Sequence, residues 1–167
     1  MHEKQHEIRR LESGWKVVLV IWGAILASLG VYFAVCINIE DSLQINISPN
    51  FPINTLKYAL FGLSCITLFV VYYLRKSLMR PGLPVVNSMQ MSSTQHPALA
   101  KYMVAIVIMS ALLESIGIYG VVLFLLAKDV SSLYQLLIIS AAAMIYFRPR
   151  KEELLNVASQ MKKHTEE

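Results

Sequence analysis

Four stretches of the chain are almost entirely apolar, and they decide what it can fold into. At a rise of about 1.5 Å per residue, each is long enough to cross a hydrocarbon layer of about 30 Å as an α-helix. Hydrophobic residues make up 56% of the sequence and charged residues only 16%, a composition typical of membrane proteins. We therefore predict an all-α, polytopic membrane protein, an antiparallel bundle of four transmembrane helices at residues 15–37, 55–74, 101–127 and 130–147.

The basic residues predict the orientation of this bundle. They are concentrated in segments 1–14, 75–100 and 148–167, which would lie on one side of the membrane. The opposite segment 38–54 contains no Lys or Arg, and the turn 128–129 is neutral overall. Since basic residues near membrane ends are retained in the cytoplasm, we expect both termini to be cytoplasmic. The basic cytoplasmic side then lies beside the anionic lipid of the bilayer, which accounts for the net charge of +4 without a nucleic-acid partner.

The segments outside the apolar stretches are too short to bury cores of their own. Residues 148–167 have apolar side chains at a spacing that suits a short amphipathic helix, which would lie on anionic headgroups. A cytoplasmic protein partner at this tail or at the loop 75–100 is the alternative. The first apolar stretch is too long for a signal-peptide core, so we expect it to be retained as a membrane helix. The protein would then be a multi-pass protein, and we expect it in a bacterial inner membrane.

Small residues in the first apolar stretch predict a packing face. They recur three and four residues apart, a spacing that lets membrane helices approach closely. The small residues are Gly23, Ala24, Ala27, Ser28 and Gly30.

The two cysteines predict no special chemistry. Cys36 and Cys65 lie in or beside apolar helices, where a free cysteine behaves as a small hydrophobe. We therefore predict no metal site, disulfide or cofactor.

One carboxylate interrupts the third apolar stretch. Glu114 is the only Asp or Glu in the four predicted membrane helices, and it lies about midway along its helix. An ionised carboxylate near the bilayer centre costs about 2.5 to 3.5 kcal/mol on insertion scales. Because the side chain is too short to reach either interface, Glu114 must be neutral or have a partner. The helical period places Ser110 on its face and Ser115 to one side.

Hydroxyl residues on other helices are expected at the same depth. Counting inward from the helix ends places Ser28, Ser64, Thr67 and Ser140 near the level of Glu114. Such a layer would suit a reversible site for a proton or a small cation. It would equally suit a permanently protonated Glu114 that only holds the helices in register, and the pattern does not choose between the two.

The third helix resembles the carboxylate-bearing helix of the c subunit, or proteolipid, of rotary ATP synthases and related ATPases. The resemblance covers about residues 95–126, where Gln95, His96 and Pro97 precede the apolar helix and Glu114, Ser115, Ile118, Tyr119 and Gly120 follow the family's pattern. By this resemblance Glu114 would be the ion-carrying carboxylate. Ser115 and Tyr119 match positions that help to form the cation site in sodium-type members. We therefore take Glu114, Ser115, Tyr119 and Ser110 as the candidate ion-binding residues.

Two classes of function follow from these patterns. The first is a proteolipid-like integral membrane subunit whose buried carboxylate exchanges a proton or, less in keeping with the pattern, a sodium ion. The second is a non-catalytic scaffold or accessory subunit of a larger complex, with other membrane subunits or further copies of itself as partners. The sequence shows no nucleophile with a base, no metal-ligand cluster and no phosphate-binding glycine loop, so we do not expect an enzyme.

Overall fold

The computed structural model describes residues 2–42, 52–78, 97–156 and 159, and within them all regular secondary structure is helical. The long helices are α1 (His2–Ile39), α2 (Ile53–Leu78), α3 (Pro97–Ala127) and α4 (Val130–Tyr146), and residues 151–156 form a further helical turn. Three of them, α1, α2 and α3, are long and apolar enough to cross a membrane. The shorter α4 has 17 residues and is also apolar. The fold is therefore helical and of a kind that suits a membrane.

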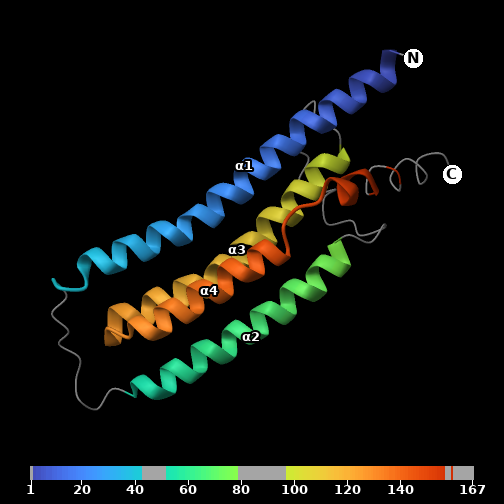
Figure 1. The fold of residues 1–167 in the computed structure, drawn as a ribbon. Coiled ribbons are helices and arrows are strands. Elements are labelled where there is room, and N and C mark those ends of the chain that lie inside the picture. Colours follow the sequence, from blue (N-terminus) through green and yellow to red (C-terminus); the bar gives the residue numbers. More distant parts are fainter. Residues whose placement is uncertain (1, 43–51, 79–96, 157–158, 160–167) are drawn as a thin grey trace.

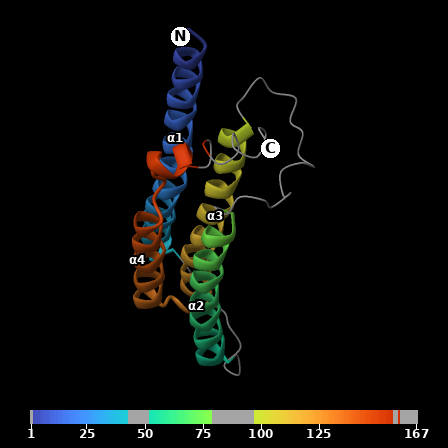
Figure 2. The ribbon, with the colours of Figure 1, turned by 90° about the vertical axis from the view of Figure 1, so that its right-hand side faces the viewer.

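Helix α3 lies at the centre of the assembly. It packs against each of the other three helices, most extensively against α4, whereas α1 and α2 make little contact with each other. The four axes run side by side in an elongated bundle, and the first turns of α1 project beyond it (Figures 1 and 2). The sequence colours show that the chain traverses successive helices in opposite directions (Figure 1).

The helices extend further than the apolar stretches that predicted them. Helix α1 is continuous from His2, so the predicted segment 1–14 and the predicted helix 15–37 form one element. Helix α2 continues to Leu78 and α3 begins at Pro97, a residue suited to the first turn because its missing N–H would have no helical partner there. Residues 79–96, most of the predicted cytoplasmic loop, lie outside the described residues, as do residues 43–51 of the predicted external loop.

Glycines of α3, and Gly14 near the start of α1, lie where helices come close together. A Cβ atom built on Gly120 would lie 3.2 Å from the Leu133 carbonyl oxygen, so α4 touches the α3 backbone there. Gly23 and Gly30 of α1 have open space where a Cβ atom would be. Of the predicted small-residue face, Ser28 contacts α3 through Glu114, whereas Ala24, Ala27 and Gly30 are exposed and mediate no close packing within this chain.

An ion pair joins α2 to the turn between α3 and α4. Lys57 Nζ lies 2.7 Å from Asp129 Oδ2, and the carboxylate also caps α4 by accepting hydrogen bonds from the Ser132 N–H and hydroxyl. Burial alone would raise the pKa of Asp129, but these three hydrogen bonds outweigh it and lower the pKa from 3.8 to about 2. Lys128, with a φ of 50°, reverses the chain between the two helices.

A second ion pair joins α2 to the segment after α4, at the other end of the bundle. Arg75 Nη2 lies 2.6 Å from Glu153 Oε1, and the Tyr102 hydroxyl accepts a hydrogen bond from the Arg150 N–H at 2.9 Å. Leu154 is buried beside this cluster, while Leu155 is exposed. The predicted amphipathic tail is thus helical at residues 151–156 and docks on the bundle by one apolar side chain. Its further apolar residues Val157, Ala158 and Met161 lie outside the described residues.

Candidate functional site

Glu114 lies at the contact between α3 and α1. Its Oε1 atom accepts hydrogen bonds from the Ser28 hydroxyl at 2.6 Å and the Tyr32 hydroxyl at 2.7 Å, both from α1. Since Ser28 and Tyr32 are four residues apart, they share a face of the helix and reach the same carboxylate oxygen. The three side chains form a polar cluster inside an otherwise apolar section of the bundle.

Packing around Gly117 sets the distance between the two helices at this site. Leu29, the neighbour of Ser28, is buried, and its Cδ2 lies 2.6 Å from the position that a Cβ atom on Gly117 would occupy. Any larger residue at this position would displace Leu29. Because Gly117 is one helical turn beyond Glu114, its lack of a side chain lets α1 approach closely enough for direct hydrogen bonds to the carboxylate.

The Ser28 hydroxyl has two oxygen neighbours at equal distance. Its Oγ lies 2.6 Å from the carbonyl oxygen of Ile25, one turn earlier in α1, as well as 2.6 Å from Glu114 Oε1. A serine hydroxyl carries one hydrogen and can also accept, whereas a peptide carbonyl can only accept. The direction of the Ser28–Glu114 hydrogen bond therefore depends on whether Glu114 carries a proton.

The structure does not bring the other candidate residues to the carboxylate. The Ser115 hydroxyl donates to the Leu112 carbonyl at 2.7 Å, a bond within its own helix. Ser110 is buried, and Tyr119 is half-buried and packs against the apolar core. Among the described residues, hydrogen bonds to the Glu114 side chain come from Ser28 and Tyr32 alone.

The expected layer of hydroxyls is only partly present. Ser28 contacts Glu114 as its depth suggested, but Ser64 and Thr67 donate to carbonyls one turn earlier in α2. Ser140 donates across to the Leu113 carbonyl of α3 at 2.7 Å and so joins α4 to the residue before Glu114. These three hydroxyls stabilise packing rather than surround the carboxylate.

Tyr32 was missed by the sequence reasoning. The available signal was its position four residues after Ser28, which places both hydroxyls on one face of α1. The hydroxyls expected at the depth of Glu114 were those of serine and threonine. A tyrosine hydroxyl lies several bonds from its own Cα, so its depth in the bundle differs from that of its Cα. Its partner therefore became identifiable only once the two helices were placed against each other.

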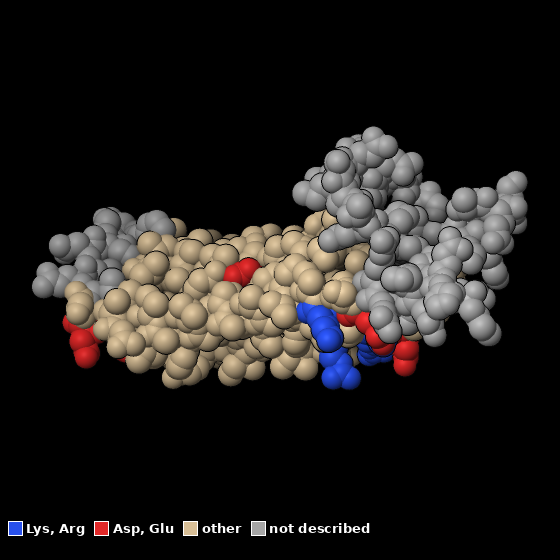
Figure 3. All heavy atoms as spheres, turned by 90° about the horizontal axis from the view of Figure 1, so that it is seen from above, with Lys and Arg blue, Asp and Glu red and all other residues tan. Residues whose placement is uncertain are grey.

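Glu114 also reaches the outer surface of the bundle. Its side chain is partly exposed, and Figure 3 shows acidic atoms in the middle of the apolar body, far from the charged ends. Among the described residues, no Lys or Arg forms a salt bridge with Glu114 and no hydrogen bond reaches its Oε2 atom. One oxygen is thus held inside the molecule and the other is available from outside.

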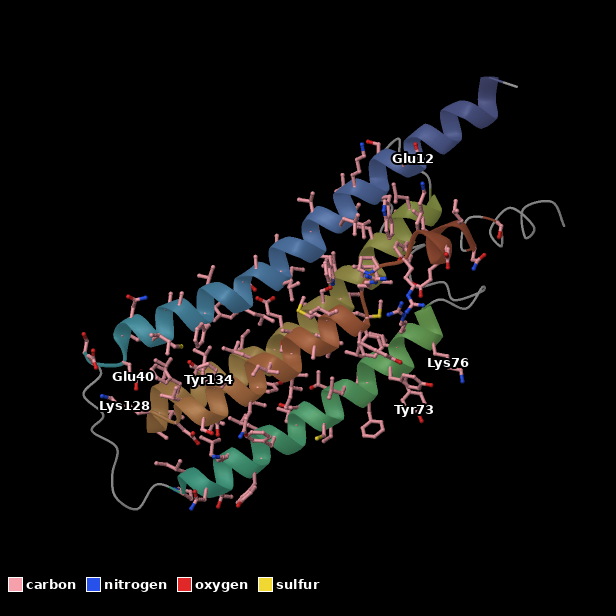
Figure 4. All side chains as sticks on the ribbon, viewed as in Figure 1. Glu12, Glu40, Tyr73, Lys76, Lys128 and Tyr134 are labelled. Atoms are coloured by element: carbon pink, nitrogen blue, oxygen red, sulfur yellow. The ribbon has the colours of Figure 1, made fainter. Side chains whose placement is uncertain are left out.

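Charged residues otherwise mark the two ends of the bundle. Glu40 and Lys128 lie at one end, while Glu12 and Lys76 lie at the other (Figure 4). None of the family models, curated proteins or solved structures compared with the chain matches it significantly.

Proposed function

We propose that this chain is a four-span membrane subunit, with both termini in the cytoplasm, in which Glu114 binds and releases a proton. Three helices long enough to cross a membrane support the membrane location, and α4 would complete the fourth span. The bias of basic residues towards segments 1–14, 75–100 and 148–167 supports the orientation. A bacterial inner membrane suits this distribution of charge.

The observation that carries the proposal is the pair of hydroxyls on Glu114 Oε1, one of which has a second acceptor. In the protonated state, Glu114 donates to Ser28 and Ser28 donates to the Ile25 carbonyl, while Tyr32 donates to Glu114. In the ionised state, Ser28 turns its hydrogen to Glu114, which then accepts from both hydroxyls. In each state, every hydroxyl or carboxyl hydrogen of the cluster has an acceptor, and no helix has to move. A reversible proton site requires this property.

A proton suits this site better than a sodium ion does. Hard cations such as Ca²⁺ and Mg²⁺ take about six or more oxygen ligands, and sodium shares their preference for oxygen. The described cluster offers one carboxylate, two hydroxyls and the Ile25 carbonyl, which Ser28 already contacts. A single proton needs only the carboxylate itself.

A hydrophobic carbodiimide tests the proposal, because it reacts with protonated carboxyl groups within membranes. The full chain would be reconstituted in liposomes, treated across a range of pH and analysed by intact mass. We expect one adduct on Glu114 that forms more slowly as pH rises. Glu114→Gln should abolish it, and the matched control Glu12→Gln, at an exposed carboxylate outside the membrane, should leave it unchanged.

The second candidate function is a scaffold subunit in which Glu114 only fastens α1 to α3. The same two hydrogen bonds favour it, since they join helices that are otherwise held by apolar contacts. Labelling that stays constant with pH, together with full assembly of the Glu114→Gln variant into its native complex, would support the scaffold and refute the proton site. Recovery of partners from native membranes by the chain truncated after Phe147 would show whether the tail recruits them.

A further inference from the structure

The exposed oxygen of Glu114 leaves the site incomplete in a single chain. The Oε1 atom has two hydroxyl donors, whereas Oε2 has no hydrogen-bond partner among the described residues and the side chain is partly exposed. In hydrocarbon no water is present to satisfy that oxygen, and a polar atom without a partner costs free energy there. A partner group is therefore expected on this face at the depth of Glu114.

A second copy of the chain supplies such a group by symmetry. Closed dimers usually have a two-fold axis, and two copies inserted in the same orientation place that axis along the membrane normal. Rotation about the normal leaves depth unchanged, so Glu114 of one copy meets Glu114 of the other at the same level. One proton between two Oε2 atoms forms a hydrogen bond in which one carboxyl donates and the other accepts.

The residues around the carboxylate allow two copies to approach. Ala24, one turn before Ser28, and Ala111, almost one turn before Glu114, are both exposed. Val31 and Ile118, one turn further along each helix, have relative exposures of 59% and 42%. This rim, defined as Ala24, Val31, Ala111 and Ile118, is apolar and has its smallest side chains on one side of Glu114. A dimer centred there would cover the carboxylate and bury the rim.

We propose that two copies of this chain pair through the Glu114 face, with one proton shared between the Oε2 atoms of the two Glu114 carboxyl groups. The inference rests on the proposed function, because the shared proton is the one that Glu114 binds. In the dimer this proton lies on Oε2 rather than on Oε1, and Oε1 accepts from both Ser28 and Tyr32. It names a second copy of the chain as the partner of the site. The proton is then taken up by a pair of Glu114 carboxyl groups rather than by one. The two groups then titrate together rather than independently.

Mixed dimers test this pairing. Chains with donor and acceptor fluorophores on the carboxyl terminus would be reconstituted in liposomes, and energy transfer would report dimerisation against pH. We expect the unsubstituted chain to dimerise more weakly by about tenfold, equivalent to about 1.4 kcal/mol, once pH is high enough to ionise both carboxyl groups. In Glu114→Gln dimers, Oε1 keeps the hydroxyl donors and the two amide nitrogens face each other, so they should be weak at every pH.

A dimer of one unsubstituted chain with one Glu114→Gln chain should behave differently from both. The amide N–H of glutamine can donate to an ionised Glu114, so this mixed dimer should persist at the high pH that separates the unsubstituted pair. Ala111→Phe, which adds bulk to the rim, should prevent dimerisation while leaving carbodiimide labelling of Glu114 in place. Ala142→Phe, at an exposed position of α4, is the matched control and should dimerise normally.

The outcomes separate this inference from the proposed function. A chain that stays monomeric while its Glu114 labelling falls with pH would overturn the pairing and leave the proton site intact. Dimerisation that is insensitive to pH, to Glu114→Gln and to Ala111→Phe would also overturn the pairing. A dimer that is weakened by Glu114→Gln and by Ala111→Phe, while its strength and its Glu114 labelling both stay constant up to high pH, would support the pairing and refute proton exchange.

Discussion

The Tyr32 hydroxyl of α1 lies 2.7 Å from Glu114 Oε1 of α3, and this bond crosses between two helices far apart in the sequence. It gives a carboxylate in an apolar helix a donor that no neighbour in its own helix provides. Because tyrosine is a donor to either state of the carboxyl group, Tyr32 holds the side chain in place while Ser28 responds to the proton. The two α1 residues thus have different roles at the same oxygen.

Tyr32→Phe should move the loss of carbodiimide labelling to higher pH. A hydrogen bond donated to a carboxylate stabilises the ionised form more than the neutral one, so its removal favours the protonated form that reacts. Ser28→Ala should produce a smaller shift in the same direction, because Ser28 has a role in both states. Tyr119→Phe is the control, since Tyr119 makes no described bond to Glu114, and a shift as large as that of Tyr32→Phe would contradict the assignment.

The Lys57–Asp129 pair should make the end of the bundle where α3 turns into α4 sensitive to acid. The pKa of Asp129 in the folded protein, about 2, lies below its ordinary value of 3.8. The ion pair therefore stabilises the fold fully above pH 3.8, and this contribution is lost as pH falls through about 2. Allowing for partial solvent exposure of both side chains, we expect about 1 to 2 kcal/mol.

Asp129→Asn separates the ion pair from the helix cap, because asparagine can still accept the Ser132 N–H bond. Reversible unfolding in mild detergent should show that this variant is less stable than the unsubstituted chain at neutral pH and lacks its fall in stability between pH 4 and 2. Asp129→Ala should be less stable still at neutral pH. Equal free energies of unfolding for the Asn and Ala variants at neutral pH would show that the cap contributes nothing. A double-mutant cycle with Lys57→Gln measures the pair itself.

Leu154→Ala should release the segment after α4 from the bundle. The side chain is 1% exposed, and replacing a buried leucine with alanine costs about 2 to 5 kcal/mol. Hydrogen exchange should rise in residues 151–156 while α3 and α4 stay protected. The matched control is Leu155→Ala, at 48% exposure, which should change stability by no more than about 0.5 kcal/mol. Equal effects of the two substitutions would refute docking by Leu154.

Gly120→Val should force α3 and α4 apart. The Cβ position lies 3.2 Å from the Leu133 carbonyl oxygen and 3.3 Å from Leu133 Cα, and backbone atoms cannot rotate away as a side chain can. Overpacking of this kind costs about 1 to 3 kcal/mol, measurable by thermal or denaturant unfolding in detergent. Gly62→Val, at a position with no atom within 4 Å, should be neutral or stabilising. If both variants unfold alike, the α3–α4 contact is not as close as described.

Hydrophobic patterning predicted the helices well because it depends on local composition. The apolar lengths predicted the end of α3 and both ends of α4 to within one residue, since Lys128 and Asp129 interrupt the pattern where the chain must turn. The start of α3, at Pro97, lies four residues before the predicted start. The start of α1 was not predictable in this way. Its polar first turns continue a helix whose apolar part is already formed, and no hydrophobic boundary stops it at the membrane edge.

The sequence by itself determined that Glu114 would have to be neutral or have a partner, because an ionised carboxylate in an apolar membrane helix is costly wherever that helix packs. The tertiary structure alone decided that the partners are Ser28 and Tyr32 rather than Ser115 and Tyr119. On α3, the Ser115 hydroxyl bonds to its own backbone, and neither Ser110 nor Tyr119 has a described hydrogen bond to the carboxylate. The hydroxyls that reach the carboxylate come from α1, and Gly117 sets how closely that helix approaches. Contacts between distant segments depend on packing, which a pattern along one helix does not contain.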